Sequence, residues 1–281
     1  MTVDSGPVLS NLGLDLEALE RMALKCRRNI IDMVYRAQAG HPGGSLSVID
    51  LLVALYGTQL RVSTSDRSHP DRDRLILSKG HASPAMYAVL AARGTISEKD
   101  LESYRLFGGI CQGHVDSSWT PGVDFSAGSL GMGLSFGIGC ALAARMDGSD
   151  REVWVILGDG ECQEGEVWEA AMAAAHHQLG NLNMIVDRNR IQNDDHIDRQ
   201  MRLGNLAAKW ESFGWSVIEI DGHDMAEVVD SLHWSREIGR PTAIIAHTVK
   251  GKGVSFMEDD PSFHGKAPND SEYRKAMAEL S

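Results

Sequence analysis

The stretch VWVILGDGECQEGEVWEAAMAAAHHQLGNLNMIVDRNRIQ, residues 153–192, contains two short apolar runs separated by an alanine-rich segment. The runs VWVIL and NMIV are apolar on both faces, which is typical of strands buried in a parallel sheet. The segment between them has the length and composition of a helix. A strand, a helix and a second strand in this order predict an α/β fold.

The same alternation of strands and helices continues on both sides of this stretch. We predict strands at 74–78, 153–157, 183–187, 216–220 and 242–247, and helices at 15–38, 47–60, 83–93, 130–146, 165–178, 204–213 and 224–238. GHPGGSLS, residues 40–47, is predicted as a loop whose serines cap the next helix, and residues 256–281 as a loop with a short helix. Residues 1–281 are therefore predicted to form one α/β domain, with a doubly wound parallel sheet flanked by helices.

The composition excludes several classes of partner. The chain has 27 basic and 39 acidic residues, a net charge of −12, which argues against binding to nucleic acid or anionic membranes. Local main-chain N–H groups can still bind a small anion. The four cysteines form no CxxC pair, the N-terminus lacks a signal-peptide pattern, and no apolar run approaches the ~18 residues of a membrane span. These features predict a cytoplasmic protein with reduced thiols.

Two oxygen-bearing side chains follow neighbouring predicted strands. Asp159 lies between Gly158 and Gly160 after the first strand of the stretch, and Asn189 follows the second. In doubly wound sheets, ligands bind at the carboxyl ends of the strands. Carboxylate and carboxamide oxygens are suitable ligands for Mg²⁺, and phosphate oxygens often complete the coordination shell of the ion. A simple Asp-Gly turn is the alternative for Asp159 alone, and the spacing by itself does not identify a cofactor.

Five of the eleven histidines adjoin a glycine in predicted loops, namely His41, His81, His114, His264 and, in DGHD, His223. A turn or an interface would explain any one of them. Histidines on several strand-end loops can also converge on one pocket, where imidazole moves protons at neutral pH. His223 is predicted to be structural and to bond its own loop, and the adjacent His176 and His177 to have surface or packing roles.

The GDG motif followed by Asn189 is similar to the thiamine-diphosphate motif, and the stretch around it resembles transketolase. The resemblance extends through GHPGGSLSVIDLLVALYG, DRLILSKGHASPAMYAVLAARG, PGVDFSAGSLGMGLSFGIGCALAAR, IDGHD and HTVKGKGVSFMED followed by HGKAPND. It covers nearly the whole chain, in order. It implies the diphosphate-binding (PP) type of the thiamine-diphosphate-binding fold.

The resemblance implies a role for individual residues. Thiamine diphosphate would bind with Mg²⁺, for which Ca²⁺ or Mn²⁺ can substitute, and the metal ligands would be Asp159, Asn189 and the carbonyl of Ile191. The implied cofactor-binding residues are His81, Gly128, Ser129, Leu130, Gly158, Asp159, Gly160, Glu164, Glu169, Asn189, Ile191 and His264. Glu164 and Glu169 would belong to a carboxylate network between subunits. The catalytic residues would be His41, His81, His114 and His264, whereas Lys250 and Lys252 either approach the diphosphate or are solvated.

Half of the family's active site has no counterpart in this sequence. In transketolases, the glutamate that activates the cofactor's pyrimidine lies in a second domain, and this chain ends soon after HGKAPND. The resemblance therefore implies the N-terminal subunit of a split transketolase. We expect a separately encoded C-terminal subunit with the pyrimidine-binding domain, an α2β2 assembly, and an isolated chain that is inactive. A fragment of a longer chain is the alternative.

The reaction implied is transfer of a two-carbon ketol unit from a ketose phosphate to an aldose phosphate. Three loops, QGHVDSS, SAGSLGMG and SFHGK, depart from the usual family wording, so a sulfo-, deoxy- or branched ketose stays open as the substrate. Two other thiamine-diphosphate enzymes are alternatives, 1-deoxyxylulose-5-phosphate synthase and a 2-oxo-acid dehydrogenase component. KGHASPAMY together with HGKAP favours transketolase. A non-catalytic subunit would predict a degraded metal site, whereas Asp159 and Asn189 are both present.

Overall fold

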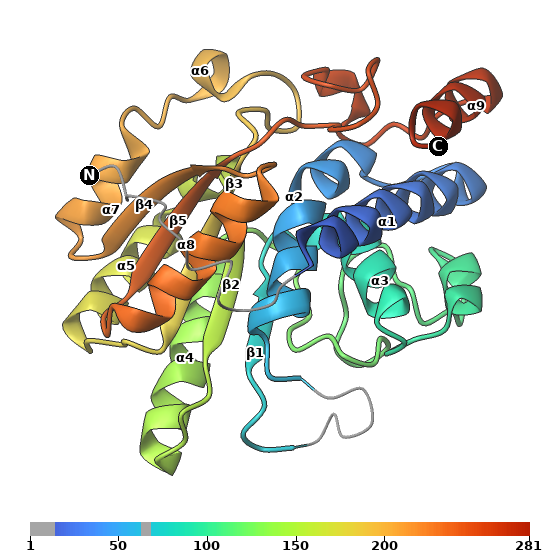
Figure 1. Ribbon diagram of the computed structural model, residues 1–281. Helices are drawn as coiled ribbons and strands as arrows, with labels where there is room; N and C mark the ends of the chain where they lie inside the picture. Colours follow the sequence, from blue (N-terminus) through green and yellow to red (C-terminus); the bar gives the residue numbers. More distant parts are fainter. Residues whose placement is uncertain (1–14, 63–68) are drawn as a thin grey trace.

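The computed structural model describes residues 15–62 and 69–281. Its centre is a five-stranded parallel sheet in the order β1-β2-β3-β5-β4 (Figure 1). The strands are β1 (Arg74–Leu77), β2 (Val153–Gly158), β3 (Leu182–Arg188), β4 (Ser216–Asp221) and β5 (Thr242–His247). The register places Gly158 beside Asp187, so β2 and β3 end side by side. The predicted doubly wound parallel sheet is confirmed.

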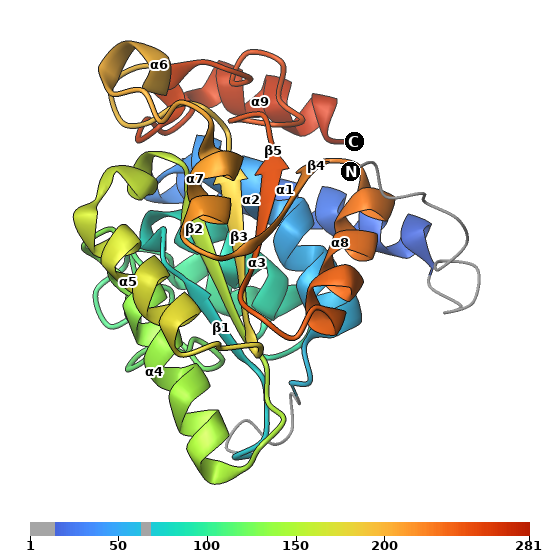
Figure 2. The same ribbon diagram turned by 90° about the vertical axis from the view of Figure 1, so that its left-hand side faces the viewer.

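Helices cover both faces of the sheet (Figures 1 and 2). One face carries α4 (Met132–Asp147), α5 (Gly165–His176) and α7 (Leu206–Ser212), and the other carries α1 (Leu16–Ala37), α2 (Pro42–Ala54), α3 (Ser83–Ala92) and α8 (Met225–Glu237). Alternate strand residues point to opposite faces. Trp154 and Ile156 of β2 join the cluster under α1 to α3, whereas Val155 joins the cluster under α4 and α5.

Shorter elements connect these layers. They are η2 (Leu55–Gln59), η3 (Gly80–Ala82), η4 (Glu98–Ser103), η5 (Gly160–Gln163), α6 (Ile197–Gln200), η6 (Pro261–Phe263) and α9 (Asp270–Glu279). The C-terminal helix α9 packs on α1, where the rings of Tyr35 and Tyr273 stack with centroids 4.0 Å apart. Within residues 15–62 and 69–281, no helix is long and apolar enough to cross a membrane.

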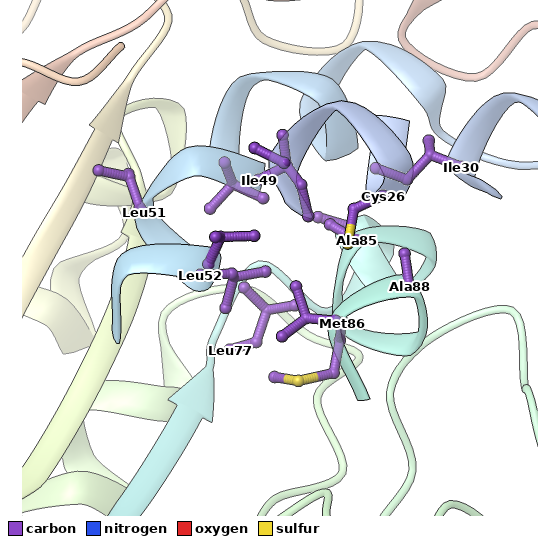
Figure 3. Close-up of a cluster of buried hydrophobic side chains, with 14 of the residues drawn as sticks. Cys26, Ile30, Ile49, Leu51, Leu52, Leu77, Ala85, Met86 and Ala88 are labelled. Atoms are coloured by element: carbon purple, nitrogen blue, oxygen red, sulfur yellow. The ribbon is translucent and has the colours of Figure 1, made fainter. Parts of the chain in front are cut away.

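Helix α2 lies at the centre of the larger hydrophobic cluster (Figure 3). Every residue from Pro42 to Ala54 is buried. Ile49 and Leu52 meet side chains of α1, α3 and β1 in that cluster, including Ile30, Met86 and Leu77. A helix that is apolar all round is buried on all sides, and its N-terminal end is therefore held firmly under the sheet's carboxyl edge.

The prediction that GHPGGSLS forms a loop is wrong, because α2 begins at Pro42. Proline has the backbone angle that a first helical residue needs, so it starts a helix well. The glycines allow close packing: a Cβ on Gly43 would lie 2.9 Å from the Phe263 carbonyl oxygen. Ser45, predicted as a cap, lies inside the helix and donates to the His41 carbonyl (2.8 Å). The other predicted elements are present, with end points shifted by a few residues.

A buried ion pair joins α1 to α2. Arg27 donates through Nη1 and Nη2 to the two carboxylate oxygens of Asp50, at 2.9 and 2.6 Å. Burial alone would raise the pKa of Asp50, but the hydrogen bond from His223 and the charge of Arg27 hold that pKa below its usual value. His223 donates from Nδ1 to Asp50 (2.7 Å) because its Nε2 accepts from the main chain of Val249 (2.8 Å). Its side chain therefore links different elements instead of bonding its own loop as predicted.

We expect Arg27→Met to lower the free energy of unfolding by about 3 kcal/mol, because Asp50 would stay buried without its counter-charge. Urea unfolding at neutral pH measures this loss. Arg36→Met is the control, since Arg36 pairs with Asp32 at an exposed position on α1, and we expect a cost below about 1 kcal/mol. Equal losses in the two variants would show that the buried ion pair contributes no more to the free energy of unfolding than the exposed one.

Candidate active site

A pocket of about 470 Å³ opens at the carboxyl ends of β1, β2 and β3. It is lined by His41, His81, His114, Gly128, Leu130, Gly158, Asp159, Gly160, Glu164, Asn189, Ile191 and His264, which were all expected at the site. Ser129 and Glu169 are exposed and are not part of its lining. The structure thus brings together residues that lie far apart in the sequence, with these two exceptions.

The four histidines form one cluster around His41. Its ring centroid lies 5.2 Å from that of His81, 5.9 Å from that of His114 and 5.3 Å from that of His264. The four rings come from the N-terminal end of α2, from η3, from the loop after η4 and from the segment after β5. Among the described residues, His41 Nδ1 is buried and has no hydrogen-bond partner, which leaves it available to a ligand.

Burial holds the histidines neutral. Burial, followed by the charge of Arg105, lowers the pKa of His41 to about 4, and the same two causes lower that of His114. Burial and then the charge of Lys250 lower the pKa of His264 to about 3. Burial and the charge of Lys79 hold the pKa of His81 well below its usual value. A neutral imidazole carries one donor and one acceptor, so the cluster can pass protons between hydroxyl groups.

Asp159 is a buried carboxylate, 3% exposed, that bonds only main-chain N–H groups among the described residues. It accepts from Gly160 at 2.9 Å and from Arg190 at 2.7 Å. Burial raises its pKa to about 7, and a divalent cation bound there would stabilise the ionised carboxylate. The oxygens of Asp159, Asn189 and the Ile191 carbonyl form a donor set that suits Mg²⁺, and the residues present therefore fit a metal-bound diphosphate.

Lys250 is buried and firmly bonded, so the alternative of a solvated lysine is wrong for this residue. It is 1% exposed and donates to the carbonyl oxygens of Ile191 (3.0 Å) and Gln192 (3.1 Å). Its Nζ also lies 2.7 Å from Nδ1 of His264. Lys252 is half-buried and lies on a separate pocket, beside β4 and β5.

Sequence reasoning missed a polar network beneath Asn189. Asp187, fully buried, accepts from Ser47 Oγ (2.6 Å) and from Lys79 and Thr248. The amide nitrogen of Asn189 donates to Ser47 (3.2 Å) and Asp187 (3.4 Å). An ionised carboxylate only accepts, so the nitrogen of Asn189 must face Asp187 and its oxygen must face away. The signal available in the sequence was a pair of opposite charges, Lys79 and Asp187, at the ends of two apolar strands.

Glu161 is a second residue that the sequence reasoning missed. It is 2% exposed and accepts from the main-chain N–H groups of Gly131 (2.8 Å) and Gly158 (3.0 Å) and from Ser78. These bonds hold the loop before α4 against the end of β2. Glu161 therefore shapes the wall of the pocket on which Gly128 and Leu130 lie.

Residues 19–280 match the family model described as transketolase, thiamine diphosphate binding domain. The chain belongs to the transketolase family. It is similar to one of the subunits of the apulose-4-phosphate transketolase of Phocaeicola vulgatus, with 39% identity over 95% of each chain. It is also similar to a 6-deoxy-6-sulfo-D-fructose transketolase subunit from a Clostridium species, with 38% identity over 93% of this chain and 96% of the relative.

Longer transketolases share the same fold. The transketolase of Campylobacter jejuni superposes with a TM-score of 0.90 at 31% identity, over 95% of this chain and 43% of the other. Human transketolase is 36% identical over 89% of this chain and 40% of its own length. The chain thus spans about two fifths of the longer transketolases and nearly all of the two subunits.

Membership of the transketolase family confirms the expected cofactor and reaction class. This transketolase chain has the thiamine diphosphate binding domain of a family that also uses a divalent metal, and it is one subunit of a transferase. Its relatives favour transketolase over 1-deoxyxylulose-5-phosphate synthase and over a 2-oxo-acid dehydrogenase component. The roles of individual site residues stay predictions.

We expect the cofactor-free transketolase chain to lose stability as the pH falls from about 7.5 to about 5. His41 and His264 have folded pKa values of about 4 and about 3, below the usual value of about 6.5. At these two histidines the unfolded chain binds more protons in this window, so the stability that they contribute rises with pH and is lost on acidification. Urea midpoints across the window measure the effect. The double variant His41→Gln, His264→Gln should have a flatter profile, and an unchanged slope would contradict the assignment.

Proposed function

We propose that this chain is the diphosphate-binding subunit of a two-chain transketolase, which transfers a two-carbon ketol unit from a ketose to an aldose. The observation that carries this proposal is one pocket in which neutral histidines adjoin an oxygen donor set at the ends of β2 and β3. When bound, thiamine diphosphate supplies the carbanion that carries the ketol unit. The protein supplies binding, orientation and proton transfer.

The metal and the diphosphate would be held at the strand ends. Asp159, Asn189 and the Ile191 carbonyl would bind the cation, and main-chain groups of Gly158 and Gly160 would approach the diphosphate. Nothing lies within 4 Å of a Cβ built on Gly128, so the loop before α4 leaves room for a ligand. Burial, followed by the charge of Lys79, lowers the pKa of Lys250 to about 7, so this side chain adds positive charge at this end of the pocket when it is protonated.

The histidines would handle the protons of the sugar. His41 has a buried ring nitrogen without a partner in the described part of the chain, which suits a bond to a substrate hydroxyl. His114 is exposed at the mouth of the pocket and can meet an incoming sugar. Since all four rings are held neutral, each can donate at one nitrogen and accept at the other.

Asp159→Ala should abolish magnesium-dependent binding of thiamine diphosphate, because the variant lacks the only carboxylate of the proposed donor set. His114→Ala should bind the cofactor normally and lower the turnover of the assembled enzyme by about 100-fold, the usual contribution of one general acid or base. Calorimetry with Mg²⁺ and a ketol-transfer assay measure the two effects. Asp150→Ala, at an exposed ion pair with Arg61, is the control. Normal cofactor affinity in the Asp159 variant would show that the metal is misplaced.

We place the partner subunit on the exposed face of α4 and α5. Met132, Phe136 and Met146 lie along one side of α4 and are 46%, 39% and 86% exposed. Met172 of α5 is 55% exposed, and the neighbouring Leu130 lines the pocket. Large exposed apolar patches mark interaction sites. A partner that covers this face would also reach the pocket and Glu164 and Glu169, and two copies of each chain would give the α2β2 assembly.

Phe136→Asp should weaken assembly with the partner subunit by at least about 10-fold, because a charge would be buried at the contact. Light scattering of the mixed subunits after size-exclusion chromatography measures this. Leu24→Asp is the matched control, since Leu24 is also 39% exposed but lies on α1. The placement is wrong if Phe136→Asp assembles like the wild type while circular dichroism shows both variants folded.

The substrate that we propose is a ketose with an anionic end, either a phosphate or a sulfonate. The two subunit-length relatives support this, since one is named for a sugar phosphate and the other for a sulfonated sugar. A deoxy- or branched ketose is included in this class. The site of action that we propose is the cytoplasm, which fits four free cysteines and a net charge of −12.

A further inference from the structure

The ammonium group of Lys250 has a hydrogen-bond partner for each of its hydrogens. Its Nζ lies 3.0 Å from the Ile191 carbonyl oxygen, 3.1 Å from the Gln192 carbonyl oxygen and 2.7 Å from Nδ1 of His264. An ammonium group donates three hydrogen bonds and accepts none. All three partners are therefore acceptors, and Nδ1 of His264 is one of them.

This contact decides which nitrogen of His264 carries the proton. The imidazole is neutral, because burial and then the charge of Lys250 lower its pKa to about 3. A neutral imidazole has one N–H group and one nitrogen that accepts. Since Nδ1 accepts from Lys250, the proton of the ring lies on Nε2.

The nitrogen Nε2 of His264 is the one left for a ligand. The ring lines the pocket, and Nε2 has no hydrogen-bond partner within residues 15–62 and 69–281. The rings of His41, His81 and His114 differ, since none of their nitrogens is hydrogen-bonded in that part of the chain. Those three rings can exchange donor and acceptor roles, whereas His264 offers a ligand only a donor.

The fold holds Lys250 in this position. The residue is 1% exposed. A Cβ on Gly43 would lie 3.0 Å from Cγ and 3.4 Å from Cε of Lys250, so this glycine leaves space for the aliphatic stem. The Lys250 carbonyl accepts from the N–H of Asp259 (2.9 Å), and the N–H of Gly251 donates to the Gly43 carbonyl (3.0 Å). These contacts hold Nζ beside the ring of His264.

We propose that Lys250 is a positioning residue that fixes His264 in the Nε2–H form, so that this histidine acts as a hydrogen-bond donor and not as a base. The inference rests on the proposed function for the reaction in which His264 takes part, whereas the tautomer is a property of this chain. The ligand atom that faces Nε2 is an oxygen that accepts. Steps in which a sugar hydroxyl loses its proton belong to the other histidines.

Nuclear magnetic resonance spectra of the full chain with isotope-labelled histidine measure the tautomer. A protonated ring nitrogen and an unprotonated one have widely separated chemical shifts, and His264→Gln identifies the signals of this ring. Spectra are recorded at about pH 6, below the pKa of Lys250, which burial and the charge of Lys79 lower to about 7. We expect only the Nε2–H form of His264, and an Nδ1–H form in the wild type would overturn the proposal.

Variants of two lysines in the same loop test the cause of this tautomer. Lys250→Met leaves two carbonyl oxygens beside Nδ1 without a donor, so the Nδ1–H form should become populated. Lys250→Arg should keep the Nε2–H form, because a guanidinium also donates only. Lys252→Met is the matched control, since the side chain of Lys252 lies on the separate pocket, and it should behave like the wild type. An unchanged tautomer in Lys250→Met would overturn the proposal.

A double-mutant cycle separates the action of Lys250 on His264 from the action of its charge on the cofactor. Calorimetry gives the affinity for thiamine diphosphate with Mg²⁺ in the wild type, in Lys250→Met, in His264→Gln and in the double variant. The double variant should bind at least about threefold more tightly than the product of the two single losses, as for residues in direct contact. Independent losses would show that Lys250 acts by its charge alone, which would overturn its positioning role.

These outcomes distinguish the role of Lys250 from the proposed function, because the spectra and the affinities need no turnover. An assembled enzyme that transfers no ketol unit, while its chain shows the expected tautomers, would contradict the proposed function and leave the role of Lys250 intact. Ketol transfer together with an Nδ1–H form of His264 would contradict the role of Lys250 and leave the proposed function intact.

Discussion

The buried ion pair between Lys79 and Asp187 is the contact on which the site depends. Both side chains are almost wholly buried, at 2% and 0% exposure, and a buried charge is tolerated only when it is paired and hydrogen-bonded. Asp187 also accepts from Ser47 of α2 and Thr248 after β5. One carboxylate thus ties together the ends of β1, β3 and β5 and the first turns of α2, and it leaves the amide of Asn189 a single satisfied orientation.

The electrostatics of the pocket follow from the same arrangement. Lys79, Lys250 and Arg105 bring positive charge close to the histidines, and burial adds to the effect, so every imidazole is held neutral. At Asp159 it is the negative charge that is disfavoured, because burial and the nearby ionised Asp187 raise the pKa of this carboxylate. A bound cation would relieve the acidic side and a diphosphate would balance the basic side. The charges of the pocket therefore favour binding of a metal cation and an anion together.

Local patterns predicted the elements that depend on local properties. Strands that are apolar on both faces, and the polar residues that follow β2 and β3, indicated the sheet and the position of Asp159 and Asn189. Lys79 and Asp187 escaped notice because they lie 108 residues apart, and their pairing follows only from the strand order. The start of α2 at Pro42 was missed for a similar reason. Gly43 was read as a loop residue, whereas it is glycine because Phe263 packs against it.

The loop glycines of the site show the same limit more generally. Gly40 indicates a sharp turn when it is read along the sequence, yet a Cβ on it would lie 2.8 Å from the hydroxyl of Tyr104, which is distant in the chain. A Cβ on Gly113 would lie 3.0 Å from the guanidinium carbon of Arg105. Asp159, Asp187 and Asn189 are at most 5% exposed, and their hydrogen-bond partners all belong to this chain. The diphosphate end of the site is therefore held by residues of this chain. A partner on α4 and α5 would add its own groups beside this half of the site.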